Sequence, residues 1–309
     1  MNFFTSDKLK KIITQSGLAD KKIIRLEFDQ PQAFSAQSRL IKIKVFIKGR
    51  LRPLIIRGNH WPVSAYHIAR DLNKEGKTSS PAPIYYHKPS KFVLYPELDG
   101  APLRHLPLTY SKLSPFIGPL AKQLALFHKT RPPAGLLKPV LKTELKRWQG
   151  NAKIIIKNSP KYSDQAKYIV KQLAFGLSKY WVNKNFTLTH GDYQASNVLV
   201  RGRSRVSLID FTMSRIYFPA SDLGIFLVHW QAMTRTHLSI TQRERLGHKF
   251  LQTYLTNAPK THKKTIIDQL PLAIAEATLD VAAISLQIYG GKDKNVNRLL
   301  TELFASLNI

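Results

Sequence analysis

The segment from Leu188 to Phe211 constrains the fold more than any other part of this 309-residue chain. Its sequence, LTHGDYQASNVLVRGRSRVSLIDF, alternates short apolar runs with polar loops. This pattern predicts a strand, a loop, and then two strands joined by a basic turn. The loop contains His190, Asp192 and Asn197, and the last strand ends at Asp210. The segment therefore predicts strand ends that carry two carboxylates and an amide.

This set of side chains suits a site that handles metal-bound phosphates. Mg²⁺ prefers oxygen ligands, keeps several waters, and accepts one or two protein carboxylates together with substrate phosphates. A further carboxylate can orient an attacking hydroxyl group and accept its proton. We assign that role to Asp192, and the metal to Asn197 and Asp210. The alternative is an ordinary Asp-Asn turn between two strands, in which Asp210 only caps a strand end.

The complete pattern, HGDYQASN followed thirteen residues later by Asp210 in IDF, resembles a family signature. It is similar to the H-G-D-x-x-x-x-N…I-D-[FW] motif of the aminoglycoside phosphotransferase and choline kinase group, a branch of the protein-kinase-like superfamily. The resemblance implies an α+β, two-lobed protein-kinase-like fold, with a small, mainly antiparallel β lobe and a larger helical lobe. It also implies ATP and Mg²⁺ as cofactors and a hydroxyl group as the phosphate acceptor.

The resemblance also divides the chain. It implies a nucleotide-binding lobe over residues 1–94, a hinge over 95–99, and a helical lobe with the catalytic loop and acceptor site over 100–309. Hydrophobic periodicity predicts an amphipathic helix within residues 1–20 and three strands within 22–57. A further helix is expected from Ser64 to Gly76, because serine and glycine are common at helix starts and ends.

The nucleotide-site residues follow from the resemblance alone. Arg57 stands where the family has a phosphate-pairing lysine on the third strand, and Tyr95, Glu97 and Leu98 stand at the hinge that meets adenine. Arginine can clamp phosphate, so the exchange is chemically tolerable; the alternative for Arg57 is a surface charge at a strand end. The chain departs from the family in two other ways. The connection QPQAFSAQS has no glycine, and the helix over 64–76 has no glutamate at its middle.

Two further residues are expected to support the loop. The resemblance implies that His190 shapes the loop and that Asp222, in the SDLG sequence, braces it by accepting backbone hydrogen bonds. Ser221 or Asp222 is also expected to cap the helix that starts there. His128, in LAKQLALFH, is expected to be a packing or capping histidine.

Residues 139–182 predict two helices with a break near Asn158. The first carries five basic residues, which usually form a solvated face but here could also attract an anionic acceptor: Lys142, Lys146, Arg147, Lys153 and Lys157. Glu276 and Asp280 lie one helical turn apart in an apolar stretch, where unpaired carboxylates are costly to bury. Either basic residues pair with them, or they contact the acceptor.

The net charge of the chain limits the chemical classes of partner that we expect. Forty-eight Lys and Arg against nineteen Asp and Glu give a net charge of +29, which favours anionic partners; solubility alone is the alternative. We therefore expect an acidic or membrane-associated acceptor rather than a cationic aminoglycoside. No run of eighteen apolar residues and no secretion signal is seen, so we expect a cytoplasmic protein, with contact to the inner membrane face left open.

Other function classes remain alternatives. A non-catalytic kinase-like module that binds an anionic partner would explain the missing glycine and glutamate together with the charge. A nucleic-acid-binding protein would explain the charge, but the sequence has no recognisable recognition motif. The absence of cysteine excludes disulfides and thiolate metal sites. The sequence does not fix the oligomeric state.

Overall fold

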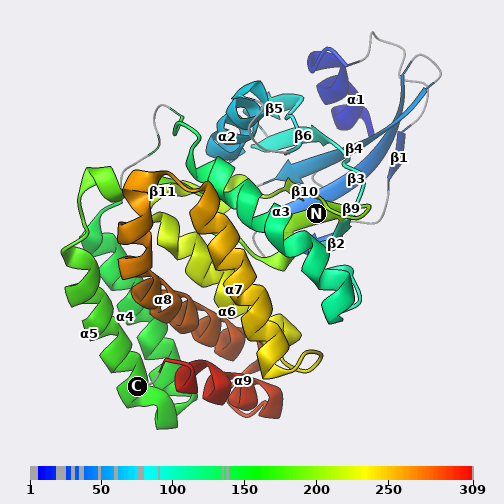
Figure 1. Ribbon diagram of the computed structural model, residues 1–309. Helices are drawn as coiled ribbons and strands as arrows, with labels where there is room; N and C mark the ends of the chain where they lie inside the picture. The colour runs from blue at the N-terminus through cyan, green and yellow to red at the C-terminus, as the bar shows by residue number, and fades with distance from the viewer. Residues whose placement is uncertain are drawn as a thin grey trace. The chain divides into compact units, whose positions relative to one another are not determined.

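A computed structural model describes residues 6–18, 26–28, 32–34, 38–47, 50–58, 62–75, 80–89, 91–133, 136 and 139–307 (Figure 1). The chain forms two compact units. The first unit is Met1–Gly100 with Ser207–Thr212, and the second is Ala101–Val206 with Met213–Ile309. The hinge predicted over 95–99 lies at the end of the first unit's main segment, and its role as a hinge stays a prediction.

An antiparallel sheet dominates the described part of the first unit, with strand order β1-β3-β4-β6-β5 and β2 paired to β3. The three strands predicted within 22–57 are present as β1, β3 and β4. The short strand β2 was not predicted, because only its pairing with β3 distinguishes these three residues from a loop. The strands are β1 (Leu26–Phe28), β2 (Gln32–Phe34), β3 (Ser38–Ile47), β4 (Arg50–Gly58), β5 (Tyr85–His87) and β6 (Phe92–Pro96).

Two helices, α1 (Ser6–Gln15) and α2 (Pro62–Glu75), accompany this sheet. In α1 the adjacent Ile12 and Ile13 are buried, as its amphipathic pattern predicts. The helix α2 begins two residues before the predicted Ser64. Proline is well suited to the first helical position because its fixed φ matches the helix and its missing N–H has no partner to lose.

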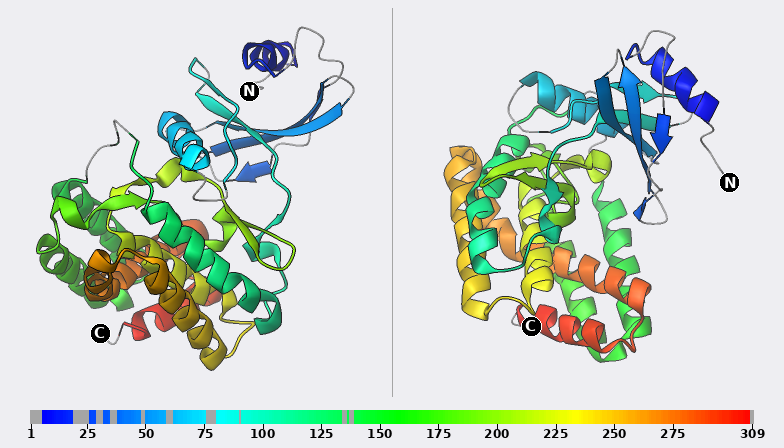
Figure 2. Two further views of the ribbon diagram at one scale, coloured as in Figure 1. Left: turned by 45° about the horizontal axis from the view of Figure 1, so that its top comes forward. Right: turned by 90° about the vertical axis from the view of Figure 1, so that its right-hand side faces the viewer.

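The second unit is mainly helical. Its long helix α8 packs against α4, α5 and α6, and α3 packs against α7 (Figures 1 and 2). By length and composition α8 could cross a membrane, but 56% of its apolar window is buried, as expected of a central core helix. The helices are α3 (Tyr110–His128), α4 (Leu141–Asn158), α5 (Ser163–Ser178), α6 (Pro219–Thr234), α7 (Ile240–Asn257), α8 (Lys263–Tyr289) and α9 (Lys294–Ala305).

The core of this unit brings α4, α5, α8 and α9 together through large apolar side chains. Trp148, Leu173, Leu286 and Phe304 belong to one buried cluster, and burying each such side chain contributes about 1.5–3 kcal/mol. At Gly224 the helices α6 and α8 approach so closely that a Cβ atom would lie 2.3 Å from the carbonyl oxygen of Ala273. Glycine is therefore required for this helix contact.

Short strands position the motif. The predicted order of strand, loop and two strands is confirmed by β8 (Thr187–Thr189), β9 (Val198–Arg201) and β10 (Arg205–Leu208). Two pairings were not predicted: β8 pairs with β11 (Arg215–Tyr217), and β9 pairs with β7 (Ala101–Pro102). The loop between β8 and β9 is therefore anchored at both ends.

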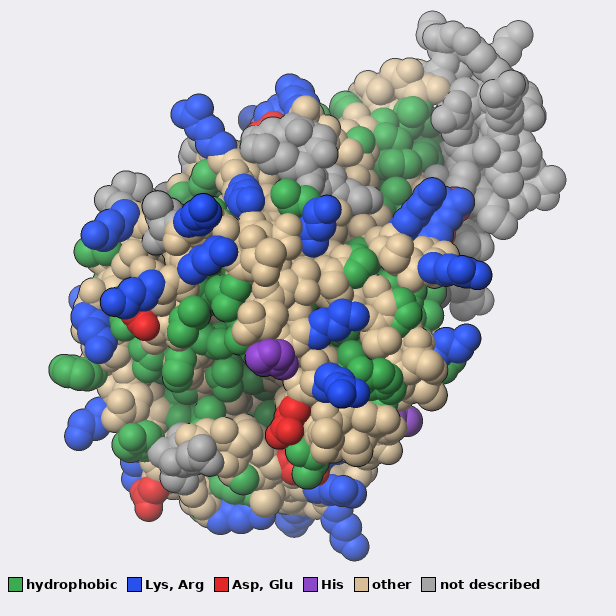
Figure 3. Space-filling view, in the orientation of Figure 1, with side chains coloured by type: hydrophobic (Ala, Val, Ile, Leu, Met, Phe, Trp, Pro, Cys, Tyr) green, Lys and Arg blue, Asp and Glu red, His purple; other side chains and the backbone are tan. Residues whose placement is uncertain are grey.

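On the face shown in Figure 3, Lys and Arg side chains are spread among apolar and neutral ones, with few Asp or Glu. This distribution agrees with a basic charge carried along the whole chain.

Candidate active site in the loop from His190 to Asn197

The loop starts with a tight backbone contact. Gly191 has φ +77°, and a Cβ atom there would lie 2.1 Å from the carbonyl oxygen of Met213. Glycine alone satisfies both the left-handed conformation and the lack of space. The hydroxyl group of Ser214 donates to the carbonyl oxygen of His190 at 3.1 Å. The start of the loop is thus held against the segment that leads into β11.

Asp192 and Asn197 are directly hydrogen-bonded. The Asn197 side-chain amide donates to Oδ2 of Asp192 at 2.6 Å and to the Asp192 carbonyl oxygen at 2.9 Å. Gln194 donates to Oδ1 of Asp192 at 2.7 Å. Both carboxylate oxygens therefore accept bonds from neutral amides, which fix the orientation of the group and leave its negative charge in place. The charge of Asp192 also acts on His229 of α6. Burial lowers the pKa of His229, and the negative charge of Asp192 partly offsets this by raising it.

The residues assigned to Mg²⁺ have suitable oxygen atoms. The side-chain N–H groups of Asn197 donate to Asp192, so the side-chain oxygen of Asn197 is the atom that can bind a cation. Asp210 is held with φ +67°, and the Thr212 hydroxyl donates to its Oδ1 at 2.6 Å. Asp210 belongs to the first unit and Asn197 to the second, so their joint coordination of one ion stays a prediction. Within the described ranges, no group of three His, Asp or Glu side chains forms a ready metal site.

Asp222 is fully buried and contacts the loop backbone. Its Oδ2 accepts the N–H of His190 at 2.7 Å, and its Oδ1 accepts the N–H of Gly191 at 2.8 Å. This is the geometry expected of a bracing carboxylate, although the role in a reaction stays a prediction. The expected helix cap at Ser221 or Asp222 is wrong. The helix α6 begins at Pro219, and its N-cap Phe218 makes no side-chain capping bond. The Asp222 side chain instead serves the loop.

His128 and Tyr254 complete the surroundings of Asp222. His128, the last residue of α3, is buried, with its Nε2 2.8 Å from Oδ2 of Asp222 and its Nδ1 2.6 Å from the Tyr254 hydroxyl group. Burial alone would raise the pKa of Asp222. The hydrogen bond from His128, the electrostatic attraction of His128 and His190, and the backbone N–H of His190 outweigh burial and lower it. Asp222 is therefore an ionised group at neutral pH.

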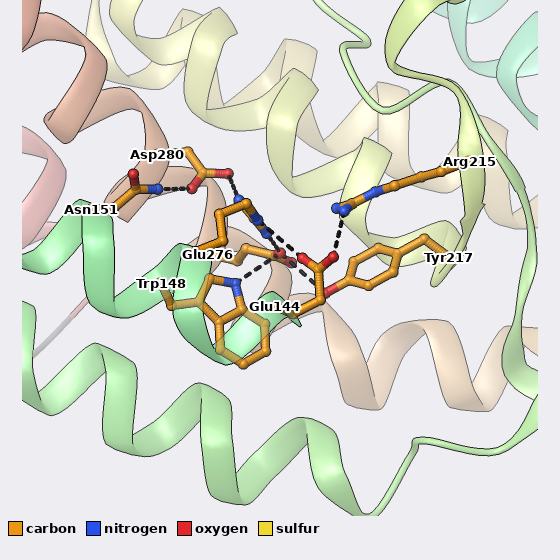
Figure 4. Close-up of polar contacts among 8 residues, drawn as sticks. Glu144, Trp148, Asn151, Arg215, Tyr217, Glu276 and Asp280 are labelled. Carbon is orange, nitrogen blue, oxygen red and sulfur yellow. Dashed lines mark hydrogen bonds and ion pairs between the residues drawn. The ribbon is translucent and has the colours of Figure 1, made fainter. Parts of the chain in front are cut away.

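Glu276 and Asp280 contact a different set of residues (Figure 4). The Arg147 guanidinium donates to both, with a distance of 2.5 Å from Nη1 to Oδ2 of Asp280. Its Nε donates to Glu144 at 3.0 Å. Of the two alternatives, the structure shows the pairing with a basic residue. Arg147 therefore does not simply belong to a solvated basic face, and an acceptor-binding role for Glu276 and Asp280 stays untested.

Further donors contact the carboxylates of this cluster, which we call the Arg147 network: Arg147, Glu144, Glu276, Asp280, Trp148, Asn151, Arg215 and Tyr217. Trp148 and Tyr217 each donate to Glu276 at 3.1 Å, and Asn151 donates to Asp280 at 2.5 Å. Arg215 donates to Glu144 at 2.7 Å and lies 4.0 Å from the centre of the Tyr217 ring. The network joins α4, α8 and β11.

Charge sharing in the Arg147 network leaves one carboxylate incompletely compensated. Burial opposes the charge of Arg147, but Glu276, Asp280 and Glu144 outweigh burial and raise its pKa. The net pKa of Asp280 is raised to about 6. Burial is the largest cause and raises it, Arg147 lowers it, and Glu276 raises it again. One guanidinium shared by three carboxylates cannot fully stabilise each of them, so Asp280 keeps a raised pKa.

The residues predicted to bind nucleotide lie in the first unit. In β4 and β6, Arg57 pairs with Val93, and Tyr95 pairs with Ile55. Glu97 and Leu98 follow β6 directly, as the hinge prediction places them. The side chain of Arg57 lies outside the described atoms, so its contact with phosphate stays a prediction. The helix α2 has an aspartate, Asp71, near its middle, and this side chain accepts a bond from the neighbouring Arg70 at 2.9 Å.

Several residues of the site were not identified from the sequence. Gln194, His229 and Tyr254 were missed, and Arg147 was assigned to the wrong environment. Tyr254 follows Leu246 and Phe250 on the apolar face of α7, so its periodicity predicts a core residue and gives no sign of its hydroxyl bond. The only sequence signal for Gln194 is its place two residues after Asp192, from which its amide donates to the carboxylate.

A comparison with family models identifies one family. The family model described as "Phosphotransferase enzyme family" matches residues 64–262, which is more than half of the chain. None of the curated proteins matches the sequence.

Solved structures show the same fold at low identity. A choline kinase from Cryptosporidium parvum Iowa II is 15% identical with a TM-score of 0.68, covering 98% of this chain and 95% of that one. A Plasmodium vivax ethanolamine kinase is 14% identical with a TM-score of 0.63, covering 100% and 91%. A spectinomycin phosphotransferase in complex with ADP and spectinomycin is 16% identical with a TM-score of 0.58, covering 99% and 94%. These similarities confirm the expected protein-kinase-like fold.

Proposed function

Because the chain belongs to the phosphotransferase enzyme family, we propose that it transfers the γ-phosphoryl group of ATP, with Mg²⁺, to a hydroxyl group of a small molecule or glycan. The observation that carries this proposal is the hydrogen-bonded pair of Asp192 and Asn197 in a loop braced by Asp222. The spectinomycin phosphotransferase with the same fold is bound to ADP, which supports ATP as the donor.

In this mechanism Asp192 orients the acceptor hydroxyl and takes its proton as the oxygen attacks the γ-phosphorus. The bond from the γ-phosphorus to the bridging oxygen breaks, and ADP leaves with that electron pair. Gln194 and Asn197 hold the carboxylate in position, so less freedom is lost on reaching the reactive geometry. Mg²⁺, when bound, neutralises phosphate charge; the Asn197 oxygen and Asp210 are the residues proposed to hold it.

Asp192→Asn tests the assignment. The substitution keeps the size of the side chain and removes its basicity, so we expect ADP formation with a competent acceptor to fall by about 10²–10⁴-fold. Asp268→Asn, which removes an exposed carboxylate of α8, is the matched control and should leave the rate unchanged. Thermal unfolding of both variants verifies that the fold is intact. Undiminished turnover of Asp192→Asn would remove Asp192 from the mechanism.

For the acceptor we propose an anionic or membrane-associated compound. The support is the net charge of +29 and the exposed lysines of α4 and α5. In the stretch from α4 to the end of α5 these are Lys142, Lys146, Lys153, Lys157, Lys161, Lys167 and Lys171. Such a field concentrates anions near the surface and repels polycations.

A screen of hydroxyl compounds for ADP formation tests the acceptor class. It should include acidic sugars, phosphorylated metabolites, choline, ethanolamine and a polycationic aminoglycoside. We expect turnover of anionic acceptors with a rate that falls as salt rises, because exposed charges are screened within about 10 Å at 0.1 M salt. Efficient turnover of the aminoglycoside would overturn the charge argument. Vesicles with and without anionic lipid test the membrane contact, and a cytoplasmic location remains our expectation.

A non-catalytic module that binds an anionic partner is the second candidate. The glycine-free connection and the lack of a glutamate in the middle of α2 favour it. A thermal shift assay with ATP and Mg²⁺ separates the two candidates, since a ligand that binds only the folded state raises the unfolding temperature. No shift at millimolar ATP would favour the module. Steep salt dependence of binding to duplex DNA would instead point to a nucleic-acid partner.

A further inference from the structure

We infer that Tyr254 on α7 is a positioning residue for phosphoryl transfer, acting through His128 and Asp222 on the backbone of the catalytic loop. The inference rests on the proposed function for the importance of that loop. Tyr254 itself does not touch the loop backbone; three hydrogen-bonded steps connect it to the amides of His190 and Gly191.

The path lies entirely in the second unit. The Tyr254 hydroxyl group is 2.6 Å from Nδ1 of His128, and Nε2 of His128 is 2.8 Å from Oδ2 of Asp222. The same oxygen accepts the N–H of His190, and the other oxygen accepts the N–H of Gly191. All three side chains are at most 7% exposed. Water therefore cannot easily replace a missing partner, and an unsatisfied polar atom in this path would be costly.

Asp222 and Tyr254, the groups on either side of His128, show which nitrogen of its ring carries the proton. Asp222 is ionised and can only accept, so Nε2 of His128 must carry a proton. Burial, and then the charge of Asp222, raises the pKa of Tyr254, so its hydroxyl group keeps its proton and can donate. A neutral His128 with the proton on Nε2 lets Tyr254 donate to Nδ1 and leaves every proton with an acceptor. Asp222 thereby fixes the tautomer, and the hydroxyl group of Tyr254 satisfies the opposite ring nitrogen and holds the imidazole in place.

Removing this hydroxyl group takes away the partner of Nδ1. With phenylalanine at 254, Nδ1 of His128 loses its donor, and the imidazole is held by Asp222 alone. The ring and the carboxylate that it contacts are then less firmly oriented against the loop amides. The ring contact survives, because the Tyr254 and His128 rings meet edge to face with centres 5.6 Å apart. Tyr254→Phe therefore isolates the hydrogen bond from the packing.

A matched control exists in the same unit. Tyr162 is also buried, and its hydroxyl group is 2.7 Å from Thr301 Oγ1 on α9, in a core cluster that does not include the loop. Tyr162→Phe makes the same chemical change and removes the part-buried bonds of this hydroxyl group to Thr301 and to the Asn297 carbonyl oxygen. A general loss of stability would appear in both variants, whereas an effect on the loop should appear only in Tyr254→Phe.

The first test needs no substrate. Amide hydrogen exchange at His190 and Gly191 should be about tenfold faster in Tyr254→Phe than in the wild type, and unchanged in Tyr162→Phe. In the wild type, ¹⁵N-histidine NMR should show His128 as the neutral tautomer protonated on Nε2. Equal protection of the two amides in Tyr254→Phe and wild type would overturn the inference, as would an imidazolium at His128.

The second test uses turnover. With a competent acceptor, kcat of Tyr254→Phe should fall about tenfold with KM little changed, because the loop loses orientation while the binding groups remain. Tyr162→Phe should keep kcat. An unchanged kcat in Tyr254→Phe would overturn the inference. If the wild type transfers phosphate to no acceptor, the proposed function fails by itself, and the exchange experiment still decides whether Tyr254 holds the loop.

Discussion

Two buried polar networks in the second unit use similar side chains in different ways. Around Asp222, one imidazole and two backbone N–H groups converge on a single carboxylate, and a hydroxyl group contacts the imidazole from its other side. In the Arg147 network, three carboxylates compete for one guanidinium, and of these carboxylates a second arginine, Arg215, donates to Glu144. The first network holds a loop backbone, and the second joins two helices and a strand through side chains.

The pKa values show what this difference means. Asp222 has a lowered pKa although it is fully buried, whereas the pKa of Asp280 is raised to about 6. A buried carboxylate stays ionised when enough donors serve it alone. When neighbouring carboxylates share the donors, their mutual repulsion adds to the effect of burial. The number of donors per carboxylate, rather than depth, decides which group changes charge near neutral pH.

The largest effect is expected for Asp222→Ala. The substitution leaves two backbone N–H groups and His128 without their acceptor, so we expect a loss of unfolding free energy on the order of 3–5 kcal/mol and loss of phosphoryl transfer. Urea unfolding and ADP formation measure the two effects. Because the pKa of Asp222 is lowered, its contribution is present at neutral pH and is lost only as pH falls below the ordinary range of aspartate. A change under 1 kcal/mol at pH 7 would contradict the brace.

Arg147→Met should also destabilise the protein without affecting the loop. The buried Glu144 and Glu276 and the half-buried Asp280 lose their shared partner, and we expect a cost of roughly 3 kcal/mol at pH 7. The cost should shrink at pH 5, where protonation of Asp280 relieves the repulsion. Lys146→Met, which changes an exposed neighbour on α4, is the control and should be near neutral. If Arg147→Met reduced kcat as strongly as Tyr254→Phe, the two networks would not be independent.

Asp280→Asn should give the smallest effect, and one with a distinctive pH dependence. The folded protein holds the Asp280 proton more tightly than the unfolded chain between the ordinary pKa of 3.8 and about 6. The stability contributed by Asp280 is therefore present below about pH 4 and is lost as pH rises through 6, by no more than about 3 kcal/mol. Compared with Asp280→Asn, the wild type should lose stability over this range. The stability difference between the wild type and Asp268→Asn should not change over this pH range. A wild type that gains stability relative to Asp280→Asn as pH rises from 4 to 6 would contradict the raised pKa.

The two networks also differ in how far the sequence reveals them. The loop residues and Asp222 were found because they lie in short motifs whose spacing alone identifies them. The partner of Glu276 and Asp280 could not be identified in this way, because Arg147 lies 129 and 133 residues away and is one of many basic residues. Pairing over such distances depends on how α4 and α8 pack, which no local pattern encodes.

Fold prediction was limited in the same way. Long periodic elements such as β3, β4 and α2 were predicted correctly in kind. The short strands β2 and β11 exist only through their pairing with β3 and β8, so local propensity could not indicate them. The start of α6 was misplaced because Asp222 resembles a helix cap in sequence, while in the structure its side chain accepts loop amides.

The lack of space at Gly191 and Gly224 has a practical consequence for work on this protein. At both positions a backbone carbonyl oxygen occupies the place of a side chain, so no other amino acid fits without moving a main chain. A saturation library scored only for the yield of folded protein should therefore retain glycine at 191 and 224. Intolerance at these two codons would reveal the loop and its supporting helix pair before any acceptor has been found.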